Sequence, residues 1–315
     1  MNEIHIHAPF IIYGLGKMGK IYYNFFKDMG LDSNISCFCD RRYLEIVEYD
    51  GKKCCGYDEA KKKGIPFFLS VYDHGAFAEI AERMDRDGIQ YYSMDNIAEY
   101  LKIDKVEFNR AYISYFHQDN MDNYYCRAEE NVNIDVFWKE SSVFFQMFEK
   151  LDLNNVIELA CGKGRHVKQY IDKAGTVTLV DVLDKNIRYC QSRFENFVNV
   201  HYYCNNGYNL ERLQSEQYTA LFSYDAMVHF EMMDIYEYLK DIYRVLIKGG
   251  RVLIHHSNYN QNYKASFVNS PHGRSYMADN LFAYLAFRCG FKILEQKTIP
   301  WGGIESLDCI SLLEK

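Results

Sequence analysis

The stretch VIELACGKGRHV, residues 156–167, joins a short apolar run to a glycine turn. The run VIELA predicts a buried strand. Gly162 and Gly164 permit a tight turn, positive φ angles and the close approach of a ligand to the main chain. This segment therefore predicts the first strand, turn and helix of an α/β domain, with the acidic Glu158 near the end of its strand.

The residues that follow continue this alternation of strand and helix. Further apolar runs predict strands at 176–181, 198–205, 219–227 and 251–258. The segment 234–246 predicts a helix that Gly249 and Gly250 are expected to end, and a helix at 277–289 leads to two final strands. The pattern predicts a mostly parallel sheet that ends in an antiparallel strand pair.

An earlier segment, IIYGLGKMGK at 11–20, has the Gly-x-Gly-x-x-Gly spacing of dinucleotide-binding turns, formed by Gly14, Gly16 and Gly19. Asp40 ends the next predicted strand, 21 residues after Gly19, where a ribose-binding acid is expected. Strand and helix patterns continue to residue 102. They predict half of a doubly wound domain that either binds a nucleotide or NAD(P), or serves as a scaffold.

The segment between these two patterns is helical and aromatic, and it contains neither glycine nor proline. We therefore expect an α/β chain with two Rossmann-like domains, in three regions: a nucleotide-binding or scaffold domain at 1–104, a helical connector and lid at 105–150, and a second domain at 151–315. Tyr124 and Tyr125 in the connector either close over a ligand or pack as core residues.

The composition argues against several classes of function. The 315 residues have a formal net charge of −7, so no broad basic surface is expected for nucleic acid. The absence of a run of about 20 apolar residues, and of an export-signal layout at the start, predicts a cytoplasmic protein without a membrane partner. The 10 cysteines follow no zinc-ligand spacing, so reduced thiols and no metal are expected.

Asp181 ends the strand TVTLVD, 19 residues after Gly162. A carboxylate at that place can accept hydrogen bonds from both hydroxyls of a ribose. The second glycine turn lacks the Gly-x-Gly-x-x-Gly spacing, so a pyrophosphate is not its expected guest. The glycine turn and this acid together predict an adenosine-containing ligand.

Five segments of this half of the chain resemble class I S-adenosylmethionine-dependent methyltransferases: VIELACGKGRHV, VTLVDVLDKNI, NNGYNL, LFSYDAMVHF and IKGGRVLIHHSNY. Their order and spacing match that family over residues 120–315. The resemblance implies a class I methyltransferase fold with S-adenosylmethionine as cofactor. The segments HHSNY and SPHGRSYM also resemble a subset of bacterial methyltransferases found with genes of polysaccharide or nucleotide-sugar biosynthesis.

The resemblance also implies roles for particular residues. Those implied to bind the cofactor are Glu158, Cys161, Gly162, Gly164, Asp181, Val182, Asn205, Asn206 and Tyr224. Within this set, the glutamate and the glycines are implied to hold the methionine part and the aspartate the ribose. One asparagine is expected near the adenine amine, and the tyrosine beside the sulfonium together with Asp225.

Transfer of a methyl group to a hydroxyl requires a base, and histidine is the natural one near neutral pH. His229 follows the fourth strand of this domain and His255 and His256 end the fifth, at the edge where ligands collect in open α/β sheets. Successive strand residues face opposite ways, so only one of the two neighbours is expected to face the acceptor. We expect His229 as the base and His256 as second choice, with Asp225 as an alternative base or an orienting group.

The sequence thus predicts a small-molecule methyltransferase that O-methylates a sugar, nucleotide-sugar or polysaccharide precursor, with a homodimer as one option. His272 and Arg274 either bind that acceptor, arginine being suited to phosphate or carboxylate, or belong to a solvated loop. N-methylation stays open. The alternatives are an NAD(P)-dependent oxidoreductase or epimerase that uses the first glycine turn, and a ligand-sensing protein without enzymatic activity.

Overall fold

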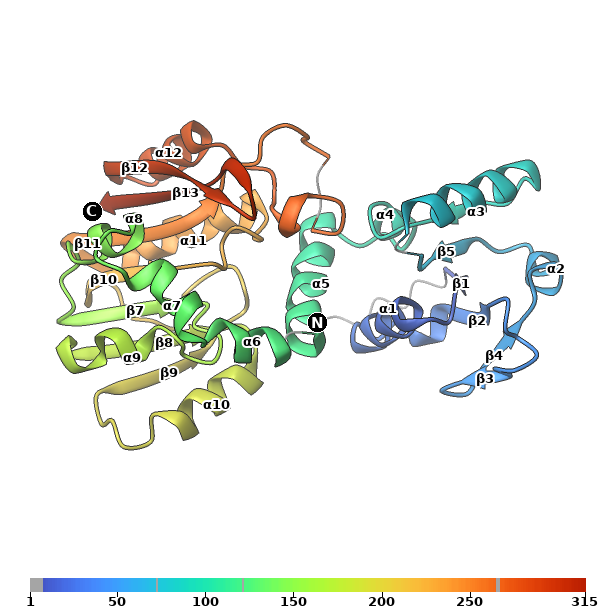
Figure 1. Ribbon diagram of the computed structural model, residues 1–315, viewed down its shortest axis with the longest axis horizontal. Helices are drawn as coiled ribbons and strands as arrows, with labels where there is room; N and C mark the ends of the chain where they lie inside the picture. Colours follow the sequence, from blue (N-terminus) through green and yellow to red (C-terminus); the bar gives the residue numbers. More distant parts are fainter. Residues whose placement is uncertain (1–7, 72, 121, 265–266) are drawn as a thin grey trace. The chain divides into compact units, whose positions relative to one another are not determined.

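A computed structural model describes residues 8–71, 73–120, 122–264 and 267–315, without the side chains of 74, 118–120, 122–124 and 131. The chain forms two compact units, Met1–Tyr112 and Ile113–Lys315. Each unit is built on its own β-sheet (Figure 1). The division between the units falls inside one helix, whereas the sequence placed the first domain boundary at 104; the three predicted regions stay a prediction.

The second unit has a seven-stranded sheet in the order β12-β13-β11-β10-β7-β8-β9. Its strands are β7 (Asn155–Leu159), β8 (Thr176–Asp181), β9 (Val200–Cys204), β10 (Tyr218–Ser223), β11 (Leu246–Ser257), β12 (Lys292–Trp301) and β13 (Ile304–Glu314). Strands β7 to β11 pair in parallel, while β13 pairs antiparallel with both β11 and β12. The predicted parallel sheet with a closing antiparallel pair is confirmed.

Helices cover both faces of this sheet because alternate residues of its strands are apolar on each side. One face packs against α8 (Val143–Phe148), α9 (Val167–Tyr170) and α10 (Asp184–Arg193). The other face packs against α11 (Met232–Val245) and α12 (Asp279–Arg288). Neighbours in one strand divide accordingly: Val156 belongs to the first core and Ile157 to the second. The sheet therefore lies between two layers of helices (Figure 1).

One detail of this unit differs from the sequence prediction. Gly249 and Gly250 do not end α11, which stops at Val245, but lie inside β11. Gly249 has a φ of 78° and donates its N–H to the Lys315 carbonyl, so the glycine pair forms an irregularity at the start of a strand rather than a helix cap. No helix joins β9 to β10 in the described chain; turns fill residues 205–217.

The first unit has a six-stranded sheet in the order β3-β4-β2-β1-β5-β6. Its strands are β1 (Phe10–Tyr13), β2 (Ile35–Cys39), β3 (Glu48–Tyr49), β4 (Lys52–Cys55), β5 (Phe67–Leu69) and β6 (Tyr91–Tyr92). Its helices are α1 (Lys17–Asp28), α2 (Tyr57–Ala60), α3 (His74–Arg86) and α4 (Ile97–Tyr100). All pairings are parallel except β3 with β4, so the predicted α/β character holds for both sheets.

The segment between the two sheets is helical, as its composition indicates. It contains α5 (Lys105–Asn120), α6 (Asp122–Ala128) and α7 (Asn131–Trp138), ahead of α8. In the part of the chain that the structure describes, no helix is both long and apolar enough to cross a membrane.

Candidate active site

The carboxyl ends of β10, β7, β8 and β9 meet at one edge of the second sheet because these strands are parallel neighbours. Every residue that the sequence analysis proposed for the cofactor lies at the end of one of these strands or in the turn after it. Two of the turns hold a non-glycine residue at positive φ, Ala160 at 58° and Asp225 at 55°. Strained main chain of this kind clusters at functional sites, which makes this edge the candidate site.

Glu158 lies in β7 and is 2% exposed. Tyr170 of α9 donates a hydrogen bond of 2.8 Å to its Oε2 atom. Its Oε1 atom is buried and has no hydrogen-bond partner among the described residues. Burial raises the pKa of Glu158 to about 8, against the opposing effect of the Tyr170 hydrogen bond. A buried carboxyl group with one unsatisfied oxygen is suited to receive a cationic group of a ligand.

The glycine turn after β7 brings main chain and side chains into close contact. Gly162 has a φ of 55°, and a Cβ atom there would lie 2.8 Å from the Tyr125 ring. Gly164 has a φ of 74°, and a Cβ there would lie 2.6 Å from the ring of Phe194. Cys161 is buried, and its pKa lies well above the ordinary value because of its hydrogen bond with a neighbouring thiol and its burial. Positions 162 and 164 therefore favour glycine. Cys161 belongs to the buried core, and its contact with the cofactor stays a prediction.

Asp181 at the end of β8 organises the site through its carboxylate. It accepts hydrogen bonds from the backbone N–H of Gly162 (2.8 Å) and of Leu183 (2.9 Å), and from the Asn186 amide (3.1 Å). A carboxylate has about four acceptor positions, so about one remains for a ligand hydroxyl. The structure thus ties Asp181 to the glycine turn. The expected contact with both ribose hydroxyls stays a prediction, as does the role of Val182, whose carbonyl accepts from Cys204.

The two asparagines after β9 have different surroundings. Asn206 closes a turn: its Oδ1 accepts from the backbone N–H groups of Tyr208 and Asn209, and its amide donates to the Asn209 side chain. Asn205 donates to the Tyr238 hydroxyl and the Asn209 carbonyl, while its buried Oδ1 has no partner among the residues described. The unsatisfied oxygen makes Asn205 the better suited of the two to accept from an amine.

His255 and His256 face opposite sides of the sheet, as the strand pattern predicts. His256 stacks on Phe282 of α12, donates from Nδ1 to the Ser257 carbonyl and lies 2.9 Å through Nε2 from the Ser311 hydroxyl. Both ring nitrogens are engaged inside the core, and burial lowers the pKa of His256 to about 3. This geometry places His256 away from the candidate site; its role as a base stays a prediction that the contacts disfavour.

His255 lies on the face that carries Tyr224, and the two rings stack at 4.5 Å. Its Nδ1 accepts a hydrogen bond from the backbone N–H of Asp225, so its Nε2 carries the proton and donates to Asp308 at 3.0 Å. Asp308 also accepts from Arg274 at 2.9 and 2.5 Å. Burial would raise the pKa of Asp308, but these two donors outweigh it and hold the pKa below its ordinary value.

The hydrogen bonds of Asp308 contradict the expectation that Arg274 binds the acceptor. Arg274 is 2% exposed and bound to Asp308, so it does not offer a guanidinium to an acceptor phosphate or carboxylate. Asp225 is paired with Arg165 at 2.8 Å, at the end of β10 beside Tyr224. Sequence reasoning missed Asp308, although a charged residue within the apolar run of the last strand is a visible signal of a buried pair.

His229 lies in the turn after β10, and its Nδ1 is 2.8 Å from the Gly273 carbonyl. A carbonyl only accepts, so Nδ1 carries the proton and Nε2 keeps its lone pair. Burial, followed by the effects of His117 and Arg274, lowers the pKa of His229 to about 3, against a smaller opposing effect of Asp225. His117 of α5 lies beside it, with ring centroids 5.3 Å apart. His117 stands in an aromatic helix without a motif, so its sequence context did not predict a site residue.

The first glycine turn has the backbone form of a dinucleotide-binding turn, but the carboxylate of Asp40 is already hydrogen-bonded within the chain. Gly14 has a φ of 98° and a Cβ on Gly19 would lie 2.0 Å from the Gly14 carbonyl, so both positions require glycine. Asp40 accepts from the Leu15 backbone N–H at 2.6 Å and from the Arg42 guanidinium at 3.1 and 3.3 Å. The acid expected to bind a ribose thus pairs with its own chain. Nucleotide binding at Gly14, Gly16, Gly19 and Asp40 stays a prediction.

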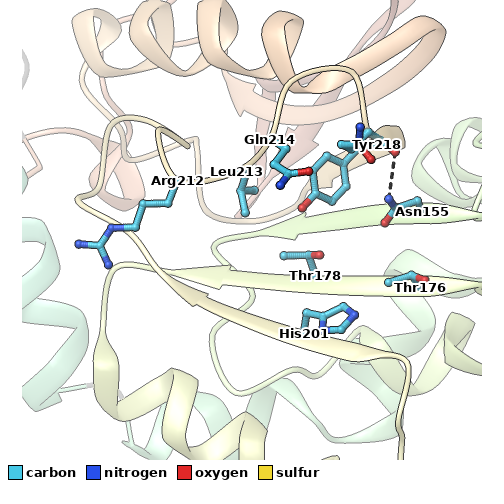
Figure 2. Close-up of a pocket in the computed structure, with 9 residues that line it drawn as sticks. Asn155, Thr176, Thr178, His201, Arg212, Leu213, Gln214 and Tyr218 are labelled. Atoms are coloured by element: carbon cyan, nitrogen blue, oxygen red, sulfur yellow. Dashed lines mark hydrogen bonds between the residues drawn. The ribbon is translucent and has the colours of Figure 1, made fainter.

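A pocket of about 260 Å³ opens elsewhere on the second unit. Figure 2 shows its lining: Asn155 on β7, Thr176 and Thr178 on β8, His201 on β9, with Arg212 and Gln214 from the turn that follows. The strand residues of this lining belong to the first halves of their strands, whereas the candidate site lies at the carboxyl ends of the strands. The described residues contain no group of three His, Cys, Asp or Glu side chains placed to hold a metal ion.

The candidate edge suits S-adenosylmethionine in its donor set. The unsatisfied Glu158 oxygen suits a cationic ammonium, and the glycine turn admits the methionine part close to the main chain. Asp181 retains an acceptor position for a ribose hydroxyl, and Asn205 an unsatisfied amide oxygen for an adenine amine. These groups come from the ends of three neighbouring strands, β7, β8 and β9, so one ligand laid along the edge can meet them all.

Several solved structures are similar in fold. One is an S-adenosylmethionine-dependent methyltransferase from Mesorhizobium loti, 13% identical with a TM-score of 0.45, covering 55% of this chain and 97% of that one. Another, from Methanosarcina mazei, is 13% identical with a TM-score of 0.41, covering 54% and 96%. A third, geranyl diphosphate C-methyltransferase from Streptomyces coelicolor, is 11% identical with a TM-score of 0.45, covering 54% and 76%. Likeness of this degree assigns neither a substrate nor residue roles.

A search of curated proteins gives no match. Residues 156–250 match a family model described as a methyltransferase domain. The matched stretch begins in β7 and ends in β11, and it includes Glu158, the glycine turn, Asp181 and Asn205. Residues 156–250 therefore match a methyltransferase domain, and the donor set at the ends of its strands suits S-adenosylmethionine as the methyl donor.

Proposed function

We propose that the enzyme methylates a hydroxyl group of a small, carbohydrate-like acceptor, with His229 as the general base. The observation that carries this proposal is the fixed tautomer of His229. Its Nδ1–H donates to the Gly273 carbonyl, which leaves Nε2 as a lone-pair acceptor next to the strand ends that hold the cofactor residues. An amine acceptor needs no such base, so the arrangement favours oxygen over nitrogen.

When bound, the cofactor supplies a methyl group on a positively charged sulfur, which is already activated for transfer. The remaining task of the chain is to orient an acceptor and exclude water. His229 Nε2 would take the proton of the acceptor hydroxyl as that oxygen receives the methyl group, which the bound donor would supply with its sulfur as the leaving group. Asp225, held by Arg165, lies close enough to favour the imidazolium that forms.

Support for a carbohydrate class comes from two sides. The segments HHSNY and SPHGRSYM resemble methyltransferases of polysaccharide and nucleotide-sugar biosynthesis, and the second of these supplies the Gly273 carbonyl that orients His229. The ring of Phe267 lies against His229 with centroids 5.3 Å apart, so polar acceptors and an apolar face occur together, as in sites for polyhydroxylated rings. A cytoplasmic setting and a homodimer belong to the same proposal.

The test has two stages. Isothermal titration with S-adenosylhomocysteine is expected to show binding that Asp181→Ala abolishes. Release of S-adenosylhomocysteine is then measured with a panel of monosaccharides, nucleotide sugars and amino sugars, for the wild type and for His229→Phe. Turnover with hydroxyl acceptors that His229→Phe removes supports the proposal. Turnover only with amino sugars, or hydride transfer from NADH in place of methyl transfer, contradicts it.

A further inference from the structure

Two histidines near the strand ends have the same hydrogen-bonding state. His117 Nδ1 lies 2.7 Å from the carbonyl of Ile113, one turn earlier in α5, and His229 Nδ1 lies 2.8 Å from the carbonyl of Gly273. A carbonyl cannot donate, so each Nδ1 carries the proton. Each neutral ring therefore presents an unprotonated Nε2, for which no partner occurs among the described residues.

The two rings are held side by side by separate elements. Their centroids are 5.3 Å apart, and the Phe267 ring lies against both, at 5.6 Å from His117 and 5.3 Å from His229. Phe116 closes the same group, 5.2 Å from Phe267. Neither histidine is fully buried. The apolar surroundings keep both rings in place, and their backbone partners fix both tautomers.

Burial is the main effect that keeps both rings neutral. Burial lowers the pKa of His117 and outweighs the opposing effects of its Ile113 hydrogen bond and of Asp225. For His229, burial, His117 and Arg274 act in the same direction, against Gly273 and Asp225. Two neutral imidazoles side by side are two hydrogen-bond acceptors with no donor between them.

We propose that His117 and His229 bind a vicinal diol, with one hydroxyl donating to each Nε2 atom. This rests on the proposed function: His229 takes the proton of the hydroxyl that is methylated, and His117 holds the neighbouring hydroxyl. A single hydroxyl has one proton and would leave the other acceptor desolvated and unpaired, which costs free energy. Two adjacent hydroxyls on one ring satisfy both acceptors, so the pair selects polyhydroxylated substrates and the position that is methylated.

The first test reads the tautomers without any activity. In long-range ¹H–¹⁵N spectra of the whole protein labelled on histidine, His117 and His229 are assigned by His117→Phe and His229→Phe. Both are expected to show a protonated Nδ1 and an unprotonated Nε2 at pH 7. A protonated Nε2 on either ring contradicts the two-acceptor site.

The second test reads binding, with S-adenosylhomocysteine present at saturation. cis-1,2-Cyclohexanediol is expected to shift the Nε2 signals of both rings, and to bind about tenfold more tightly than cyclohexanol because it makes one more hydrogen bond. His117→Phe keeps the ring packing and is expected to remove this preference. His117→Gln, whose amide oxygen accepts, is expected to restore part of it. The control His201→Gln, in β9 and outside the site, is expected to change nothing.

Equal affinity for the diol and cyclohexanol, or a His117 signal that the diol leaves unmoved, overturns the proposal. So does loss of the preference in the His201→Gln control. Failure of S-adenosylhomocysteine itself to bind contradicts the proposed function instead. Because cofactor binding is measured separately, the two failures are distinguishable.

Discussion

Glu158 shows how a buried group can be kept ready for a ligand. Its carboxyl has a pKa of about 8 because burial disfavours the charged form, and its Oε1 has no partner in the described chain. In the free protein the group is therefore protonated at neutral pH. A cationic ligand group beside it would restore the carboxylate, so cofactor binding is expected to release a proton at pH 7.

The pKa of Glu158 leads to a stability prediction. The folded value of about 8 lies above the ordinary 4.5, so folding takes up a proton between these values, and the contribution is lost as pH rises through 8. The melting temperature of the free wild type should therefore fall between pH 6 and 9 by more than that of Glu158→Gln. Calorimetry over this range checks it, with the exposed Glu211→Gln as control. Equal pH slopes for wild type and Glu158→Gln contradict the prediction.

The substitution Glu158→Gln also tests the role of Glu158 in ligand binding. Because Gln cannot carry a charge, Glu158→Gln should weaken binding of S-adenosylhomocysteine by about 10- to 100-fold, the range for a lost hydrogen bond to a charged group. Isothermal titration at pH 7 measures this effect. Unchanged affinity would mean that Glu158 is not the residue that meets the cationic part of the ligand.

His229 leads to a prediction on pH. Its pKa of about 3 keeps the ring neutral far below the ordinary histidine value of 6.5, while His117, Arg274 and Asp225 are the charged or titratable groups around it. At saturating cofactor, kcat should therefore show no loss from histidine protonation between pH 7.5 and 5.5. His229→Phe should lower kcat about 10²- to 10⁴-fold, as expected for a general base. A decline with an apparent pKa near 6.5 that His229→Phe removes would contradict this assignment.

At the scale of single elements, the turn after β7 is the most constrained part of the site. Ala160 and Gly162 both adopt positive φ, and Asp181 in the next strand holds the Gly162 N–H. The turn is therefore held to the neighbouring strand β8, where the Val180 carbonyl also accepts from the Cys161 N–H. Tyr125 of α6 lies against it and accepts a hydrogen bond from Asn186 at 3.2 Å. The side chain of Tyr124 lies outside the described residues.

Gly162→Ala tests this turn. The new methyl group would meet the Tyr125 ring at 2.8 Å, so binding of S-adenosylhomocysteine should fall about tenfold or more. Gly249→Ala is the matched control, since Gly249 also has positive φ but has nothing within 4 Å of a Cβ. It should cost about 1–2 kcal/mol of stability without affecting binding. If Gly162→Ala binds as well as Gly249→Ala, the turn does not contact the cofactor.

Sequence patterns predicted some strands and helices correctly and missed others. Strand and helix alternation predicted the second sheet, since each of its strands is an apolar run that ends in a polar or glycine turn. The β3–β4 hairpin was missed, although Asp50 and Gly51, both at positive φ, form the Asp-Gly pair typical of a hairpin turn. The helix predicted at 234–246 ends at Val245, but Gly249 and Gly250 do not end it, because β11 begins before the glycines rather than after them.

The residues of the candidate site also divide into those that the sequence could predict and those that it could not. Glu158, Gly162 and Asp181 could be predicted because each stands at a fixed place relative to a strand end. His117 and Asp308 could not be assigned roles, because their partners lie 112 and 53 residues away at His229 and His255. Which of two neighbouring histidines faces the site depended on the register of β11 with β13, which no local pattern specifies.

At the scale of the whole chain, two units have separate cores. The apolar cluster of Ile11, Phe67 and Met84 belongs to the first unit, and the clusters on both faces of the second sheet to the other. All the residues that fit the cofactor lie in the second unit. Chains of this kind need not unfold in one step.

Ligand binding should therefore act on one unit. S-adenosylhomocysteine at 100 times its dissociation constant stabilises the state that binds it by about 2.7 kcal/mol. Calorimetry should show one unfolding transition shifted upward and a second one unmoved. With Asp181→Ala neither transition should shift. If both transitions move together in the wild type, the units unfold as one and this prediction is wrong.

The pair of Arg274 and Asp308 has a consequence for how the enzyme can change. Arg274 ties residues 267–278 to the last strand of the sheet through two hydrogen bonds, and its Nη1 also holds the His272 carbonyl. The tether uses one guanidinium and one buried carboxylate, so it does not depend on the side chains between 267 and 272. Those positions can be exchanged to admit a different acceptor while the methyl-donor half stays intact, which makes this segment the natural place to alter specificity by design or by evolution.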